Sequence, residues 1–232
     1  MSYNIPVYVK NSFYYPGALE INKARINHLA KLKLNFKDKK ILETGCGGIG
    51  DITKFLYDEK AIITLNDYRK ENIDALLSNT NLTLKYNTWD LNEIINNNNN
   101  KKFDIIVCYG TLYHLTKLEN AFLNLANLCN EYVIISTCTS GKNDEEINIV
   151  DEGNSNEQSS NGKGSRPGRL LIWNLLKKNF KYTYCIKSQP NNSDYPLSFP
   201  SDHSSSRNIF IGSHVKINNE NLVENLINSY TL

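Results

Sequence analysis

The chain has 232 residues, of which 40% are hydrophobic and 22% are charged, with a formal net charge of +2. This composition is typical of a globular protein with one sizeable core, so we expect a single domain over residues 1–232. The small net charge gives no sign of a nucleic-acid partner, and no apolar run approaches the ~20 residues of a membrane-spanning helix. The five cysteines lack the spacing of metal ligands or of a redox pair. With no signal-peptide pattern at the N-terminus, they predict a cytoplasmic protein.

Apolar segments of strand and helix type alternate along the chain. The first 19 residues form an aromatic arm, expected either to pack on the domain or to cover the active site. Helices are expected over 20–34, 52–57, 70–77, 91–95, 118–128, 169–179 and 220–230, and strands over 41–42, 61–65, 82–86, 103–109, 132–137, 182–186 and 208–211. This alternation predicts an α/β, doubly wound, mostly parallel sheet. Residues 140–168, rich in Gly, Ser, Asn, Asp and Glu, are expected to form a loop on the substrate side or a disordered segment.

A glycine-rich turn follows the first strand. The strand ends at Glu43, four glycines lie between Gly45 and Gly50, and a helix begins near Asp51. A loop without side chains lets backbone N–H groups approach a ligand, and Asp67 at the tip of the next strand can accept two ribose hydroxyls. The spacing Gly-x-Gly-x-x-Gly fits NAD, but S-adenosylmethionine needs the same two features.

Four features favour S-adenosylmethionine over NAD. Glu43 places a carboxylate just before the glycines, where it can accept a hydrogen bond from a cationic amino-acid ammonium. A helix precedes the first strand, whereas dinucleotide-binding domains commonly start at that strand. Trp89 and Asp90 close the third strand, where they can serve the adenine ring. The chain also ends in two strands that suit an antiparallel sheet edge.

These motifs resemble those of class I S-adenosylmethionine-dependent methyltransferases. The resemblance rests on the segment Glu43–Gly50, on Asp67, on Trp89–Asp90 and on the strand and loop Phe103–Leu115. It implies a Rossmann-like sheet of seven strands with an antiparallel last strand, and it implies methyl transfer. The cofactor-binding residues expected from the motifs are Glu43, Gly45, Cys46, Gly47, Gly48, Asp67, Tyr68, Trp89, Asp90 and Tyr109.

A narrower resemblance is to the FkbM-like methyltransferases. It rests on five short segments, namely Ile49–Thr53, Asp67–Asn72, Leu112–Leu115, Gly164–Pro167 and Gln189–Pro190. The chain departs from that group's pattern in a longer glycine loop. This resemblance implies an acceptor such as a sugar, a nucleotide-sugar or a glycan precursor.

His114 is the candidate general base for removing a proton from an acceptor hydroxyl. It follows the fourth strand, at the sheet edge where open α/β folds bind ligands, and an imidazole can take up a proton near neutral pH. The alternative is that Tyr113 and His114 only pack beside the adenosine. The four histidines show no metal-ligand clustering, so no metal site is predicted, although the sequence leaves a divalent ion open.

Candidate substrate contacts lie mainly in and after the 140–168 loop. Arg166 and Arg169 could bind a phosphate or carboxylate through their guanidinium groups, although Arg169 could equally just begin a helix. Glu152, Tyr113 and Gln189 complete the candidate set.

The sequence therefore favours O-methylation of a small molecule or sugar. An RNA methyltransferase is the second hypothesis, because lysines cluster over 31–40 and 177–181. A third is a methyltransferase-like subunit that binds the cofactor without turnover. The acceptor atom and the oligomeric state stay open.

Overall fold

A computed structural model describes residues 14, 16–96, 102–153, 155–202 and 206–232. Its centre is an eight-stranded sheet in the order β10-β8-β9-β5-β4-β1-β2-β3. The strands are β1 (Lys40–Thr44), β2 (Ile62–Asn66), β3 (Lys85–Asn87), β4 (Phe103–Tyr109), β5 (Cys129–Thr139), β8 (Tyr182–Ile186), β9 (Ser206–Ser213) and β10 (Leu222–Val223). The predicted α/β sheet is confirmed, and all but one of the strands coincide with or overlap a predicted segment.

The sheet is parallel over β3, β2, β1, β4 and β5. Strand β9 is antiparallel to both of its neighbours, β5 and β8. The antiparallel last long strand is thus present, but it lies inside the sheet rather than at its edge. The sequence missed the two-residue strand β10, which pairs with β8 and adds an eighth strand.

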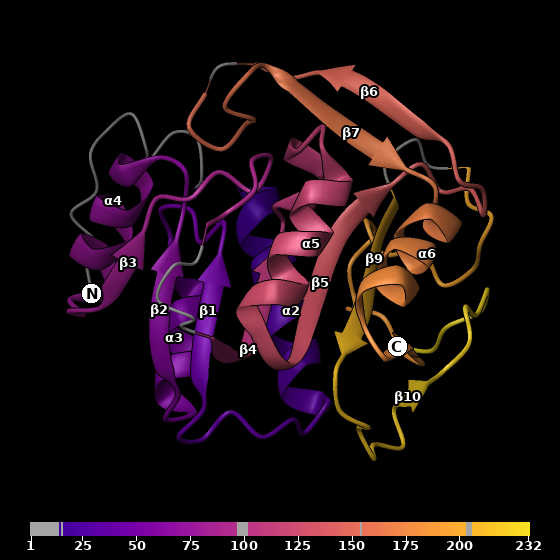
Figure 1. Ribbon diagram of the computed structural model, residues 1–232, viewed down its shortest axis with the longest axis horizontal. Helices are drawn as coiled ribbons and strands as arrows, with labels where there is room; N and C mark the ends of the chain where they lie inside the picture. The colour runs from indigo at the N-terminus through magenta and orange to yellow at the C-terminus, as the bar shows by residue number, and fades with distance from the viewer. Residues whose placement is uncertain (1–13, 15, 97–101, 154, 203–205) are drawn as a thin grey trace.

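Helices cover both faces of the sheet (Figure 1). On one face lie α2 (Pro16–Lys31), α3 (Asp51–Asp58) and α4 (Lys70–Thr80), and on the other lie α5 (Leu118–Leu128) and α6 (Arg169–Asn179). Successive strand residues alternate between the two cores, as a pleated strand requires. Ile105 packs with the residues of α2, α3 and α4, whereas Ile106 packs with those of α5 and α6. Burial on both faces explains the continuous apolar runs of these strands.

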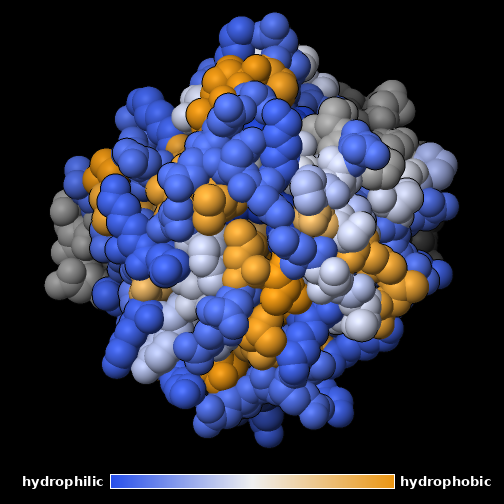
Figure 2. Space-filling view, turned by 90° about the vertical axis from the view of Figure 1, so that its right-hand side faces the viewer, coloured by the Kyte–Doolittle hydropathy of each residue, from blue (hydrophilic) through white to orange (hydrophobic). Residues whose placement is uncertain are grey.

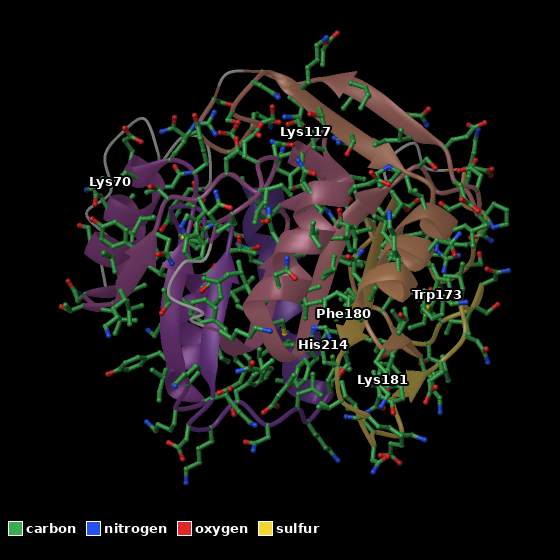
Figure 3. All side chains as sticks on the ribbon, in the orientation of Figure 1. Lys70, Lys117, Trp173, Phe180, Lys181 and His214 are labelled. Atoms are coloured by element: carbon green, nitrogen blue, oxygen red, sulfur yellow. The ribbon has the colours of Figure 1, made fainter. Side chains whose placement is uncertain are left out.

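The core on the α5–α6 side of the sheet extends to the end opposite the C-terminal ends of the parallel strands. Figure 3 shows Phe180 and His214 beside each other there, and their ring centroids are 4.8 Å apart. No helix within the described residues is long and apolar enough to cross a membrane.

The segment over 140–168 is not simply a loop. It contains a separate two-stranded antiparallel sheet, in which β6 (Ile147–Asp151) pairs with β7 (Lys163–Pro167). This β6–β7 hairpin crosses the end of the sheet at which the parallel strands finish (Figure 1). A Cβ on Gly164 would lie 2.6 Å from the backbone oxygen of Tyr113, so only glycine lets the hairpin pack this closely.

The outer strand of the hairpin carries apolar side chains into solvent. Ile147 and Ile149 are 39% and 51% exposed. Figure 2 shows hydrophobic surface at the same end of the molecule. The alternation Ile-Asn-Ile-Val was a strand signal within a polar segment, but the surrounding composition masked it.

Two predicted helices are absent, and one prediction lies mostly outside the described residues. Residues 220–230 form turns and the strand β10, because their carbonyl groups and side chains bond to the sheet and to α6 rather than along a helix. Residues 91–95 form a turn, in which the amide of Asn92 donates to Asp90. Of the predicted arm over 1–19, residues 1–13 and 15 lie outside the described part, and 16–19 belong to α2.

Candidate functional site

The glycine loop between β1 and α3 is a tight backbone turn. Gly45 and Gly47 have φ values of 65° and 60°, in the left-handed region that favours glycine. A Cβ on Gly45 would lie 1.8 Å from the hydroxyl oxygen of Thr111, which donates a hydrogen bond to the carbonyl of Thr44. The loop therefore needs glycine both for its conformation and for the close approach of the loop after β4.

Two residues at the end of β2 hold this loop in place. The backbone oxygen of Asn66 accepts hydrogen bonds from the amides of Gly45 and Cys46, at 2.7 and 3.2 Å. Its side-chain oxygen accepts the amide of Trp89 at 2.9 Å. Asp67 Oδ2 accepts the amide of Gly47 at 3.0 Å, so the acid and the loop are fixed relative to each other.

Asp67 is 8% exposed and is held on its other oxygen by Asn72 and by the amide of Arg69. Burial raises its pKa, against the effect of these donors, which lower it. A buried carboxylate fixed in this way is ready to accept further hydrogen bonds from a ligand.

Glu43 lies at the end of β1 and is 4% exposed. Its side chain accepts a hydrogen bond from Thr53 at 2.7 Å. Burial raises the pKa of Glu43 to about 8, although the hydrogen bond from Thr53 lowers it. The carboxyl is therefore largely protonated at neutral pH and becomes a stronger acceptor when a cation approaches.

Two neighbouring hollows open at this edge of the sheet. The larger one has a volume of about 350 Å³ and the smaller one about 110 Å³. Gly45, Gly47, Gly110 and His114 line both hollows, so these residues mark their common wall.

All ten residues predicted to bind a cofactor line one hollow or both. The larger hollow contains Glu43, Gly45, Cys46, Gly47, Gly48 and Tyr109, and the smaller one contains Gly45, Gly47, Asp67, Tyr68, Trp89 and Asp90. Motifs that are up to 66 positions apart in the chain thus meet at one place, as the parallel topology requires.

The loop between β6 and β7 covers the smaller hollow. Arg69 donates hydrogen bonds to the carbonyl groups of Gln158 and Ser159, at 2.7 and 3.0 Å. Asn72 donates to the carbonyl of Asn156 at 3.0 Å. Because Asn72 also bonds to Asp67, the covering loop and the acid are connected through one side chain.

His114 lies in the short helix η1 (Leu112–His114) after β4 and lines both hollows. Its Nδ1 is 2.6 Å from Oε2 of Glu152, which the hairpin brings to it. Since a carboxylate only accepts, Nδ1 donates this hydrogen bond, and in the neutral imidazole the lone pair is then on Nε2. This arrangement fits an imidazole that can take up a proton.

Glu152 is held as a carboxylate. Burial by itself raises its pKa, but His114, the amide of Ser159 and the guanidinium of Arg166 outweigh burial. The pKa of Glu152 therefore lies below its usual range. The prediction that Glu152 contacts substrate does not fit the structure, because its side chain is 4% exposed and faces these three partners instead.

Tyr113 and Arg166, two of the residues predicted to contact substrate, line the larger hollow. The Arg166 guanidinium carbon lies 5.2 Å from the centroid of the Tyr113 ring. Arg207 from β9 lies 5.0 Å from the same centroid. The tyrosine therefore has a cation near it from each of two distant segments.

The predictions for Arg169 and Gln189 are wrong. Arg169 is fully buried and lines neither hollow. It donates hydrogen bonds to Asn143, Asn208, Asn228, Tyr230 and the carbonyl of Ile227. Gln189 is 1% exposed, and its backbone amide bonds to the carbonyl of Thr231. Both residues hold the C-terminal segment on the sheet.

Sequence reasoning missed several residues of the site. Arg25 from α2 and Arg207 line the larger hollow, and Glu157 and Gln158 line both. Arg25 carried a usable signal, since it lies four residues from both Ile21 and Leu29, on the apolar stripe of its helix. Arg207 carried none, because its position depends on the pairing of β9. No group of three or more His, Cys, Asp or Glu residues in the described part is arranged to hold a metal ion.

Comparison with curated proteins finds methyltransferases over about half of the chain. The ubiquinone biosynthesis O-methyltransferase of Rickettsia bellii is 30% identical over 112 residues, which are 45% of this chain and 45% of that protein. The histidine protein methyltransferase 1 homolog of Dictyostelium discoideum is 32% identical over 110 residues, 44% of this chain and 35% of that protein. The chain thus spans about half the length, or less, of the curated relatives it matches. No family model matches the chain.

Solved structures match over most of the chain at low identity. The N-terminal domain of EvdMO1, determined with S-adenosylhomocysteine (SAH) and D-fucose, superposes with a TM-score of 0.64 at 15% identity, covering 86% of this chain and 84% of that one. Magnesium protoporphyrin IX methyltransferase from Synechocystis PCC 6803, with bound S-adenosylmethionine, has a TM-score of 0.54 at 14% identity and covers 91% and 86%. The fold is therefore that of the class I methyltransferases.

Proposed function

We propose that this chain is an S-adenosylmethionine-dependent methyltransferase that methylates an oxygen of a small molecule. The observation that carries the proposal is the fixed pair of Asp67 and the glycine loop, joined by the hydrogen bond to the amide of Gly47. The pair lies where two hollows meet, with His114 on their common wall.

The residues present fit the cofactor. Asp67 has the position and burial to accept the ribose hydroxyls, and Trp89 with Asp90 lines the same hollow for the adenine. Glu43 lines the other hollow, where its carboxyl can accept a hydrogen bond from the ammonium group of the methionine moiety. The glycine loop lines both hollows. Gly45 has no space for a Cβ, so the loop is bare backbone at this position.

When bound, S-adenosylmethionine would supply a methyl group activated on a sulfonium for transfer to the acceptor oxygen, with S-adenosylhomocysteine as the leaving group. His114 takes the hydroxyl proton on Nε2 and becomes an imidazolium. Oε2 of Glu152 lies 2.6 Å from Nδ1 and accepts its hydrogen bond, and it so orients the ring and stabilises its charge. Glu152 is a positioning residue, and Arg166 and Ser159 hold it in turn.

The acceptor is a small molecule in this proposal. The β6–β7 hairpin and its loop cover the site, and the larger hollow of about 350 Å³ is the size of a small-molecule pocket. A sugar or nucleotide-sugar acceptor follows from the resemblance to the FkbM-like group, which stays a prediction.

The experiment is a transfer assay with methyl-labelled S-adenosylmethionine. The protein is incubated with fractionated small metabolites, nucleotide-sugars first, and with total RNA in a parallel arm, and mass spectrometry identifies what gains the label. The proposal expects label in one small-molecule fraction and none in RNA. Label in RNA alone would establish the RNA alternative. Tight SAH binding without transfer to any fraction would indicate a binding subunit without turnover.

A further inference from the structure

Two arginines in the larger hollow have buried N–H groups without a partner among the described residues. These are Nη2 of Arg25 and Nη1 of Arg207. Both side chains line the larger hollow, and neither lines the smaller one. A buried guanidinium N–H that bonds to nothing is costly, so such groups usually mark a place where a ligand supplies the acceptor.

Arg25 reaches the hollow from α2 and is 6% exposed. Its Nε donates to the hydroxyl of Tyr195 at 2.8 Å, and its Nη1 donates to Asn22 at 3.3 Å. Within the described residues it has no acidic partner closer than 4.0 Å. The hydroxyl of Tyr195 is in turn 2.7 Å from that of Ser136 on β5, so the acceptor of the Arg25 Nε hydrogen bond is itself fixed.

Arg207 reaches the hollow from β9. Its Nε donates to Asp194 at 3.2 Å, and its guanidinium lies 5.0 Å from the Tyr113 ring centroid. Burial lowers the pKa of Arg207, but the effects of Tyr113, Cys138 and Tyr195 outweigh burial and raise it. The side chain is therefore charged at any pH at which the protein is folded.

Among the described acids that line the hollow, none forms an ion pair with Arg25, and one pairs with Arg207. Glu43 and Asp51 belong to the glycine-loop end, and burial raises the pKa of both, to about 8 for Glu43. Glu157 lines both hollows and so lies at their boundary. Asp194 alone pairs with one of the arginines, and its side chain is 42% exposed.

We propose that the methyl acceptor carries an anionic group, a carboxylate or a phosphate, which Arg25 and Arg207 bind in the larger hollow. The inference rests on the proposed function, because it names the chemical class of the acceptor for that same site. A planar guanidinium can donate two parallel hydrogen bonds to either anion, and the two free N–H groups supply donors that are otherwise unused. Binding of the anion would place the acceptor against the wall that carries His114.

The test is a calorimetric titration with defined probes, in the presence and absence of saturating SAH. The probes are inorganic phosphate, phenyl phosphate, benzoate and the neutral benzyl alcohol. The expected result is binding of at least one anionic probe and at least tenfold weaker binding of benzyl alcohol. The affinity for phenyl phosphate, compared with that for benzoate, decides whether the site prefers a phosphate or a carboxylate.

Substitutions locate the binding. Arg207→Met and Arg25→Met should each weaken the affinity for the anion at least tenfold. Arg207→Lys should recover part of the loss, because lysine keeps the charge but lacks the paired donors of a guanidinium. Lys177→Met is the matched control, since it removes the same charge from an exposed position on α6. Melting curves and SAH affinity show whether each variant is folded.

Three results would overturn the inference. These are anion affinity unchanged in both arginine variants, affinity for benzyl alcohol equal to that for both benzoate and phenyl phosphate, and no anion binding to the wild type. Loss of SAH affinity in Arg25→Met with anion binding intact would assign Arg25 to the cofactor's carboxylate and overturn the two-arginine site. Failure of the proposed function is separable, because it appears as absent SAH binding while the anion titrations still report on the arginines.

Discussion

The two halves of the site are built in different ways. The half around the glycine loop consists of backbone at the tips of adjacent parallel strands, and its central hydrogen bond joins Gly47 and Asp67, 20 positions apart. The half that faces the acceptor consists of side chains from α2, η1, β9 and the hairpin. There, Arg25 and Tyr195 are joined across 170 positions.

This difference separates a geometry set by the backbone from one set by side chains. Backbone at strand tips can bind the same cofactor whatever the surrounding side chains are. Side chains that come from distant segments can change one at a time without disturbing the sheet. We therefore expect changes in the glycine-loop half to affect cofactor binding, and changes in the acceptor half to affect acceptor binding and turnover without changing cofactor affinity.

The largest expected effect is on the acceptor side. His114→Gln removes the proton acceptor, and we expect kcat to fall by about 10²- to 10⁴-fold, the usual contribution of general base catalysis. SAH affinity should stay within about twofold in calorimetry. The measurement is the initial rate with the acceptor found in the transfer assay. A variant that keeps full kcat would remove His114 from the chemistry and leave it a packing role.

The next effect is on the cofactor side. Asp67→Ala removes both the ribose acceptor and the partner of the Gly47 amide. With two charge-assisted hydrogen bonds lost, we expect SAH affinity to fall about 100-fold or more. The matched control is Asp74→Ala, an exposed acid on α4 whose side chain is 54% accessible. If Asp67→Ala binds SAH as tightly as the control, the cofactor does not bind between Asp67 and the glycine loop.

The same comparison explains how much of the site the sequence could predict. Glu43, Asp67 and Asp90 were found because each lies at the end of its strand or shortly after it, and parallel strands bring such positions to one edge. Arg169 was misplaced because a sequence does not show which side of a helix start faces the sheet. Glu152 was placed near the site, but its pairing with His114 depends on the register of the hairpin.

The third prediction concerns Arg169, which we expect to stabilise the fold without contributing to the site. Arg169→Met would remove the shorter hydrogen bond to each of the acceptor oxygens of Asn208 and Ile227, and the Tyr230 hydroxyl would be their one remaining donor among the described contacts. We expect the free energy of unfolding to fall by about 2–4 kcal/mol, measured by chemical denaturation. SAH affinity and KM of the folded variant should not change. A specific rise in KM at unchanged stability would instead return Arg169 to substrate binding.

The smallest expected effect is the release of a proton when the cofactor binds. Burial raises the pKa of Glu43 to about 8, so the free protein carries a proton there at pH 7, and a bound cation should lower that pKa and release the proton. Calorimetry of cofactor binding at pH 7 in HEPES and in Tris, which differ in ionisation enthalpy, should therefore show up to one proton released. Glu43→Gln should abolish the release.

The raised pKa of Glu43 also predicts a pH dependence of stability. The folded state holds a proton that the unfolded state loses above about pH 4.3, so the free energy of unfolding should fall as pH rises toward 8. Glu43→Gln should be flatter with pH over this window. An unchanged slope would mean that Glu43 is not protonated in the free protein.

The central claim is that the glycine loop holds S-adenosylmethionine rather than a dinucleotide. Titration calorimetry of the wild-type chain with SAH and, separately, with NAD tests it most directly. We predict micromolar or tighter binding of SAH and no detectable binding of NAD. Binding of NAD without binding of SAH would contradict the account.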